Sequence, residues 1–179
     1  MMKTWMMFVL LSVAFQAEAQ KLITRTATAS FYSKAKLEDI SAENKQVTML
    51  INTATQAVAV KVPIRSFEFE KALMEEHFNE NYLESEKYSE ATFSGKISES
   101  TPVDWKKDGT YEVNVEGKLT LHGVAKSITE KATITIKGET ISVTCKFRVK
   151  LADYGIKNDK LENIAEEIDI RINGELKPL

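Results

Sequence analysis

The sequence is poor in the residues that cross-link small proteins or bind metals. It contains one cysteine, Cys145, so an intrachain disulfide is excluded and the fold must depend on burial and hydrogen bonding. The two histidines, His77 and His122, have no spacing with Cys145 that is typical of a zinc site. Because Cys145 alternates with aliphatic residues, we expect an inert thiol rather than a nucleophile. We therefore predict no metal and no cofactor.

The sequence also lacks the motifs of common enzymes and an excess of charge of one sign. It has no G-x-S-x-G elbow, P-loop, H-E-x-x-H or Rossmann fingerprint. Paired glutamates such as Glu75–Glu76 fall on polar faces and indicate solvated surface rather than an acid–base pair. With 24 basic and 26 acidic residues the net charge is −2, which does not favour nucleic acid or an anionic membrane surface as a partner. We predict that the protein is not an enzyme and does not bind nucleic acid.

Long hydrophobic runs are absent, and the apolar run at the N-terminus is too short to span a bilayer comfortably. Met1–Lys3 is positively charged, Trp5–Phe15 is apolar, and Ala17–Glu18–Ala19 fits a small-residue cleavage pattern. We interpret residues 1–19 as a signal peptide. Residues 20–179 would then be one exported soluble domain without a stable membrane anchor.

Apolar and polar residues alternate through most of residues 20–179. This period of two predicts strands with one dry face and one wet face, and turn pairs such as Asp108–Gly109 separate them. The clearest runs are Thr110–His122, Ile128–Lys137, Ile141–Leu151 and Ile168–Leu176. About eight strands at hairpin spacing predict an all-β antiparallel barrel or sandwich.

The interior of such a barrel can be filled by side chains or can hold one small ligand, and the alternation leaves both alternatives open. Glu130 interrupts an otherwise apolar row. It either contacts the polar end of a ligand or is turned outward by a β-bulge or register shift, and we favour the bulge because an unpaired carboxylate is costly on a dry face.

The segment of residues 71–93, "KALMEEHFNENYLESEKYSEATF", breaks the alternation. Its apolar residues recur at helical spacing and share one face: Leu73, Met74, His77, Phe78 and Tyr82. A short amphipathic helix is not stable alone in water. Because the outer faces of the strands are polar, we expect this helix to close one end of the barrel.

The stretches "KALMEEHFNENYLESEKYSEATFSGKI", "GKLTLHGVAKSI" and "FRVKLADYGI" resemble the YceI-like family of lipid- or polyisoprenoid-binding proteins. The resemblance implies an eight-stranded lipocalin-like barrel in the periplasm, with a long apolar chain in its lumen. The motif positions are matched by His77, Phe78, Leu83, Phe93, Leu121 and His122. One departure is Thr28, which lies near the place of a histidine that family members commonly carry.

We therefore expect a periplasmic binding protein for a polyisoprenoid, an isoprenoid quinone or a fatty-acyl chain, and the alternative is an envelope interaction module with a filled barrel. The residues expected to line or close the lumen are Phe31, Phe67, Phe69, Leu73, Met74, Phe78, Phe93, Leu119, Leu121 and Phe147. His77, His122 and Glu130 are candidate polar contacts, although each histidine is also expected to satisfy a backbone group at the barrel rim. The oligomeric state is left open, a homodimer included.

Overall fold

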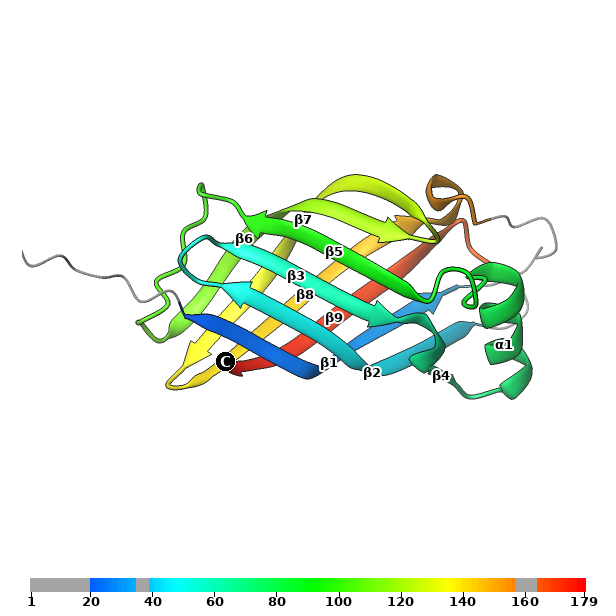
Figure 1. Cartoon of the computed structure of the whole chain (residues 1–179), viewed down its shortest axis with the longest axis horizontal. Coiled ribbons are helices and arrows are strands. Elements are labelled where there is room, and N and C mark those ends of the chain that lie inside the picture. Colours follow the sequence, from blue (N-terminus) through cyan, green and yellow to red (C-terminus); the bar gives the residue numbers. More distant parts are fainter. Residues whose placement is uncertain (1–19, 35–38, 157–163) are drawn as a thin grey trace, which may run out of the picture.

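The computed structural model describes residues 20–34, 39–156 and 164–179, so the interpretation of residues 1–19 as a signal peptide concerns residues outside the described part. The described strands form one antiparallel sheet (Figure 1). They are β1 (Lys21–Ser33), β2 (Ile40–Asn52), β3 (Ala57–Pro63), β4 (Phe67–Phe69), β5 (Glu90–Ile97), β6 (Gly109–Leu121), β7 (Val124–Lys137), β8 (Thr140–Lys150) and β9 (Glu167–Pro178).

Eight of these strands close into a barrel. The order along the sheet is β1-β9-β8-β7-β6-β5-β3-β2, and β1 also pairs with β2, so the two ends of the sheet meet. The short strand β4 adds to β2 through Ala42–Phe69 and Asn44–Phe67. The predicted eight-stranded antiparallel barrel is confirmed. The long strands are rich in Val, Ile and Thr, whose branched side chains pack well on a pleated surface.

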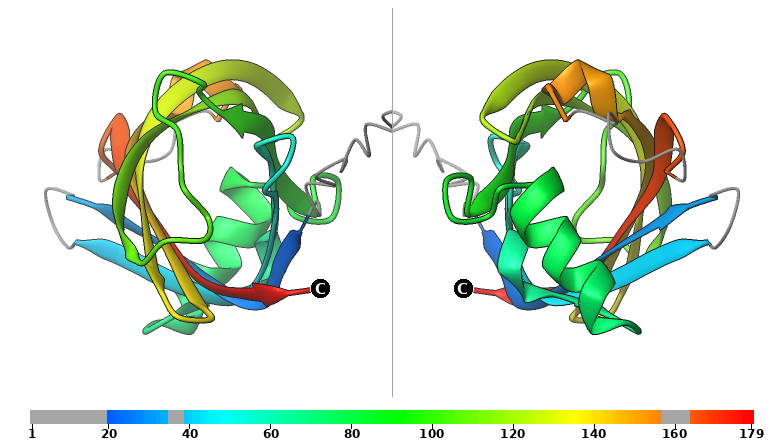
Figure 2. Two further views of the ribbon diagram at one scale, coloured as in Figure 1. Left: turned by 90° about the vertical axis from the view of Figure 1, so that its left-hand side faces the viewer. Right: turned by 90° about the vertical axis from the view of Figure 1, so that its right-hand side faces the viewer.

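A short helical segment lies across one end of the barrel, as Figure 2 shows in its right-hand view. It consists of α1 (Ala72–His77) followed by a π-helical turn, η2 (Phe78–Tyr82). Short 3₁₀ turns are η1 (Ile64–Ser66), before β4, and η3 (Leu151–Tyr154), after β8. The expectation that a short helix closes one end is confirmed. Within the described ranges no helix has the length and hydropathy needed to cross a bilayer.

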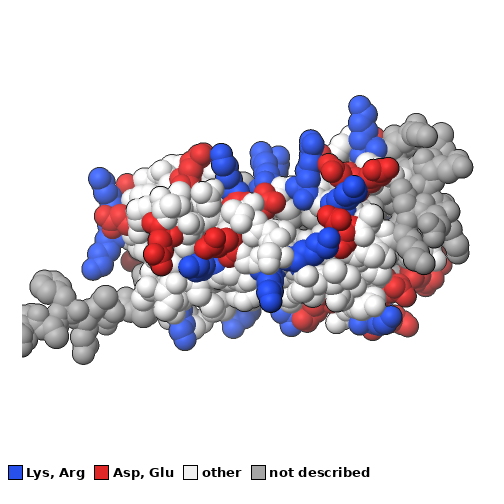
Figure 3. Space-filling view, turned by 90° about the horizontal axis from the view of Figure 1, so that it is seen from above, with Lys and Arg blue, Asp and Glu red and all other residues white. Residues whose placement is uncertain are grey.

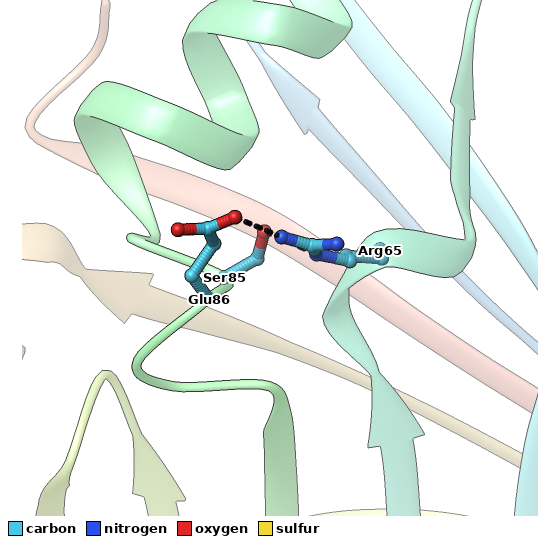
Figure 4. Close-up of polar contacts among 3 residues, drawn as sticks. All are labelled: Arg65, Ser85 and Glu86. Atoms are coloured by element: carbon cyan, nitrogen blue, oxygen red, sulfur yellow. Dashed lines mark hydrogen bonds and ion pairs between the residues drawn. The ribbon is translucent and has the colours of Figure 1, made fainter.

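Polar contacts fasten the helical segment to the barrel. In Figure 4 the guanidinium of Arg65 reaches from η1 to the chain that follows η2. Arg65 Nε donates to Ser85 Oγ at 3.3 Å, and Arg65 also pairs with Glu86 at 3.0 Å. Ser85 is 2% exposed, and the hydrogen bond from Arg65 satisfies its buried hydroxyl oxygen. The helical segment is therefore held in place by polar side chains as well as by its apolar face.

The other end of the barrel is crossed by the loop between β5 and β6, seen in the left-hand view of Figure 2. Val103 in this loop is buried, and Trp105 packs against the main cluster of core residues. Tyr111 Oη donates to the carbonyls of Asp104 and Lys107, at 3.2 and 3.0 Å, which ties the loop to β6. Both ends of the barrel are thus covered by apolar side chains.

On the face shown in Figure 3, acidic and basic side chains of the described residues are interspersed. Exposed ion pairs also join neighbouring strands, such as Lys61–Glu90 between β3 and β5 and Lys96–Glu116 between β5 and β6. Exposed pairs of this kind contribute little stability, about 0–1 kcal/mol each. That face therefore offers no patch of one sign.

Candidate functional site

The lumen of the barrel, the space enclosed by the eight strands, contains a hollow of about 180 Å³. We call it the lumen hollow. Its walls come from all eight barrel strands and from residues after β4 and β8, and nearly all of its described lining residues are aliphatic or aromatic. Among them only Thr92 and Glu130 carry an oxygen in the side chain, and Glu130 alone is an acid. The arrangement suits an apolar guest.

Seven of the ten apolar residues predicted from the sequence line the lumen hollow. They are Phe31, Phe67, Phe78, Phe93, Leu119, Leu121 and Phe147. The ring of Phe93 lies over two inward-facing glycines that are paired across β5 and β6, Gly95 and Gly117. A Cβ atom added at either glycine would lie within 3 Å of the Phe93 ring. The glycine pair therefore makes room for an aromatic side chain and not for a ligand.

A second hollow of about 290 Å³ lies beneath the helical segment, and we call it the mouth hollow. Two further predicted residues, Phe69 and Met74, line it together with His77. Phe31 and Phe78 line both hollows. Their rings stack with centroids 5.5 Å apart and planes at 15°. Leu83, Leu151, Ile156 and Ile168 also border both hollows, so the stacked pair is one part of what lies between them.

Leu73 does not share the buried face of the helix. Its side chain is 62% exposed and borders neither hollow, so its placement on that face was wrong. Within α1, Leu73 and His77 are one turn apart and both are exposed, whereas Met74 and Phe78, also one turn apart, are partly buried. The buried side of the helix is thus that of Met74 and Phe78, and it leads to the buried residues Tyr82 and Leu83 at the C-terminal end of the segment.

Glu130 faces the lumen, and the expectation that a bulge turns it outward was wrong. The pairing of β6 with β7 is continuous from Gly109–Ile136 to Leu121–Val124 and places Glu130 opposite Val115. Both residues line the lumen hollow. Burial raises the pKa of the Glu130 carboxyl, so the neutral form persists to higher pH than in water. The side chain remains partly exposed, which reduces the cost of its position.

The thiol of Cys145 lies next to Glu130 in the lumen wall. Burial, together with the charge of Glu130, raises the pKa of Cys145 to about 11. The thiol donates a hydrogen bond to the carbonyl of Lys131 at 3.4 Å. At neutral pH it is therefore protonated and a poor nucleophile. Within the described ranges no cluster of three or more His, Cys, Asp or Glu side chains could hold a metal ion.

His122 lies at the barrel rim, where it had been expected, and not in the lumen. Its Nδ1 atom is 3.2 Å from the carbonyl oxygen of Tyr154, and its Nε2 atom is 2.8 Å from Glu84. His122 and Gly123 have φ angles of 50° and 74°, which is the backbone of a type I′ hairpin turn between β6 and β7. The predicted contact with a backbone group is confirmed, and the second contact joins this turn to the segment after η2.

Several lining residues were missed by the sequence analysis. They are small or aliphatic wall positions that the alternation places inward without marking them as lining: Ala29, Met49, Ile51, Ala91, Ile97 and Ala132. The sequence marked these residues only by their alternating positions, which place them on the inward face of a strand.

The relatives of this sequence agree with the architecture. Residues 12–176 match the family model of the YceI-like domain. The chain belongs to the YceI-like family. It is 32% identical to the protein YceI of Escherichia coli O157:H7 over 131 residues, which are 69% of this chain and 64% of that protein. It is 30% identical to a UPF0312 protein of Pseudomonas fluorescens over 127 residues, which are 67% of this chain and 62% of that relative. The match thus spans less than two thirds of the length of each relative.

Solved structures show the same YceI-like fold. A polyisoprenoid binding domain from Saccharophagus degradans superimposes with a TM-score of 0.74 over 90% of this chain and 100% of that domain, at 16% identity. BcnA of Burkholderia cenocepacia gives a TM-score of 0.69 over 84% of this chain and 95% of that protein, at 19% identity. At identities of 16% and 19% the likeness establishes the barrel fold and does not identify a ligand of this chain.

Proposed function

We propose that this protein binds a long apolar lipid in the barrel lumen and carries, stores or sequesters it in the bacterial periplasm. The lipid is a polyisoprenoid, an isoprenoid quinone or a fatty-acyl chain. The observation that supports the proposal most directly is the lumen hollow, about 180 Å³ of space with almost wholly apolar walls. The polyisoprenoid binding domain with the same fold agrees with it. The N-terminal leader pattern supports export, and binding proceeds without turnover.

The driving force is the removal of hydrocarbon from water. Each buried methylene contributes about 0.8 kcal/mol, so a chain of some ten methylenes offsets a substantial ordering cost. The polar outer faces of the strands offer no comparable surface. A chain that enters the lumen therefore gains most of its free energy from contacts with the aliphatic wall.

The volume of the lumen hollow alone limits the length of chain that it can hold. An engineered apolar cavity of about 150 Å³ holds one benzene molecule, whereas drug-sized ligands occupy pockets of about 300–1,000 Å³. A long chain must therefore also use the mouth hollow of about 290 Å³. Phe31 and Phe78 border both spaces, so separation of their stacked rings is a route by which the two could join. We propose that the lipid enters beneath the helical segment and displaces Phe78.

The test is organic extraction of protein purified from its native host, followed by mass spectrometry. The wild-type protein should yield one lipid in near-stoichiometric amount. Ala132→Trp fills the lumen at a lining position and should abolish recovery of that lipid. Ala125→Trp makes the same change at an exposed position of the same strand and should leave recovery unchanged. Repeated clean extracts from the wild-type protein would refute the carrier and favour an envelope interaction module.

A further inference from the structure

Glu130 is the acidic exception in a hydrocarbon wall. It lies between Ile128 and Ala132 on the inward row of β7, and all three residues border the lumen hollow. No hydrogen bond or ion pair of its carboxyl group occurs within the described part of the chain. The carboxyl group is partly buried, and no described side chain there compensates its partial desolvation. A polar partner from outside the chain would satisfy it.

The backbone pairing between β7 and β8 is interrupted beside Glu130. It extends only from Lys137–Thr140 to Ala132–Cys145. We call the continuation in which the two strands do not pair with each other, Val124–Lys131 of β7 and Lys146–Lys150 of β8, the fork. Its vertex is the Ala132–Cys145 pair, and Glu130 lies two residues from it on β7.

The far end of the fork is bridged by polar contacts to η3. Lys126 pairs with Asp153 at 3.4 Å, and His122 Nδ1 contacts the carbonyl of Tyr154 at 3.2 Å. Along the fork the two strands are therefore joined by side chains in place of backbone hydrogen bonds. Val124, Phe147 and Tyr154 belong to one apolar cluster there, and Glu130 borders the lumen hollow near the paired end. A chain in the lumen could place its polar end there without leaving the hydrocarbon wall.

The groups near Glu130 determine which head group fits. Cys145 on β8 and Tyr154 on η3 are the titratable groups that sense its charge, and burial raises the pKa of both, so both are neutral at pH 7. The cation of the same row, Lys126, is four residues away, about 13 Å along the strand, and is paired with Asp153. Among the described residues, no positive charge is placed to compensate an anion beside Glu130, and like charges repel more strongly in a partly buried site than in bulk water.

We propose that the fork is the head-group site of the bound lipid, that it takes an uncharged hydrogen-bond donor such as the hydroxyl of a long-chain alcohol, and that Glu130 excludes anionic head groups. The proposal rests on the proposed function, because it requires a chain in the lumen. The carboxyl group accepts a hydrogen bond from a hydroxyl in either protonation state. A lipid phosphate or carboxylate carries the same negative charge as the Glu130 carboxylate and is repelled by it.

The test uses three probes with the same chain: hexadecane, 1-hexadecanol and hexadecyl phosphate, each offered to delipidated protein and quantified by mass spectrometry after gel filtration. Wild-type protein should bind hexadecanol at least about tenfold more tightly than hexadecyl phosphate. Glu130→Gln should bring the two affinities to within about threefold by improving binding of the phosphate. Glu112→Gln, on the outer face of β6, should retain the wild-type ratio.

The outcomes distinguish the head-group site from the proposed binding of a lipid chain in the lumen. If none of the probes binds, the carrier function and the head-group site both fail. If hexadecane binds but the phosphate binds as well as the alcohol, only the head-group site fails. The same holds if Glu130→Gln leaves the ratio unchanged while Tyr82→Phe abolishes it, because the head group would then lie in the mouth hollow. If Glu130→Gln does not fold, the protection of Cys145 in the unsubstituted protein decides the placement of the head group.

Cys145 supplies a local readout in the unsubstituted protein. It is the single cysteine of the chain and lies at the vertex of the fork. Hexadecanol should slow its alkylation by an uncharged maleimide more than hexadecane does at equal occupancy. Equal protection by the two probes would overturn the placement of the head group.

Discussion

Substituting Ala132 by leucine should make the unliganded protein more stable, and this sign distinguishes a hollow barrel from a filled one. Ala132 is 7% exposed and borders the lumen hollow of about 180 Å³. Leucine adds roughly three methylene equivalents, each contributing about 0.8 kcal/mol when buried, so the free energy of unfolding should rise by about 2 kcal/mol. In a filled interior the same substitution overpacks the core and costs about 1–3 kcal/mol.

Urea denaturation of delipidated protein measures the difference, and the melting temperature should rise by roughly 4–8 °C in parallel. Ala125→Leu, at an exposed position of the same strand, controls for the change in strand propensity and should shift stability by less than about 0.5 kcal/mol. The affinity of the protein for an apolar chain should fall in Ala132→Leu and stay unchanged in Ala125→Leu. A destabilised Ala132→Leu that retains full lipid affinity would refute the hollow lumen.

Three further substitutions test the chemistry and packing of the wall. Glu130→Gln removes a charge that raises the pKa of Cys145, so alkylation of Cys145 by iodoacetamide at pH 8 should accelerate by about two- to threefold; an unchanged pH–rate profile would contradict the contact. His122→Ala breaks two hydrogen bonds at the rim and should lower the free energy of unfolding by about 1–3 kcal/mol in urea, and a neutral effect would show that the rim is fastened elsewhere. Gly117→Ala places a Cβ atom 2.5 Å from backbone atoms of β5 and should lower the melting temperature by several degrees. Gly109→Ala is the control, because the nearest atom to its added Cβ is 3.5 Å away, and it should leave the melting temperature unchanged.

The barrel was predictable because its strands keep a strict period of two over long stretches. Thr110–His122 is an example, and it forms β6 and the turn after it. Alternation assigns each residue to a face, and a buried face fixes register strongly. It does not say which strands close the sheet. The pairing of β1 with β9 joins the first and last strands, which are far apart in sequence and carry no matching pattern.

The candidate site was predictable where a large side chain stands at an inward position. Phe31, Phe67 and Phe78 were found in this way. Leu73 was misplaced because the helical pattern does not say which of the adjacent residues Leu73 and Met74 lies on the buried side, and the structure buries the side of Met74. Glu130 was misjudged for another reason. The anomaly was visible, but the interruption of the β7–β8 pairing that leaves its side chain partly solvated has no counterpart in the sequence pattern.

Whether the lumen is hollow depends on residue size at a few positions, which alternation cannot report. An eight-stranded barrel is just wide enough for side chains to fill it, so small inward residues decide the outcome. Gly95 and Gly117 leave no space, because the ring of Phe93 lies over them. Ala29, Ala91 and Ala132 border the hollow directly, from three different strands. The space available to a lipid therefore depends on these three alanines, and enlarging any of them should close the lumen without disturbing the sheet.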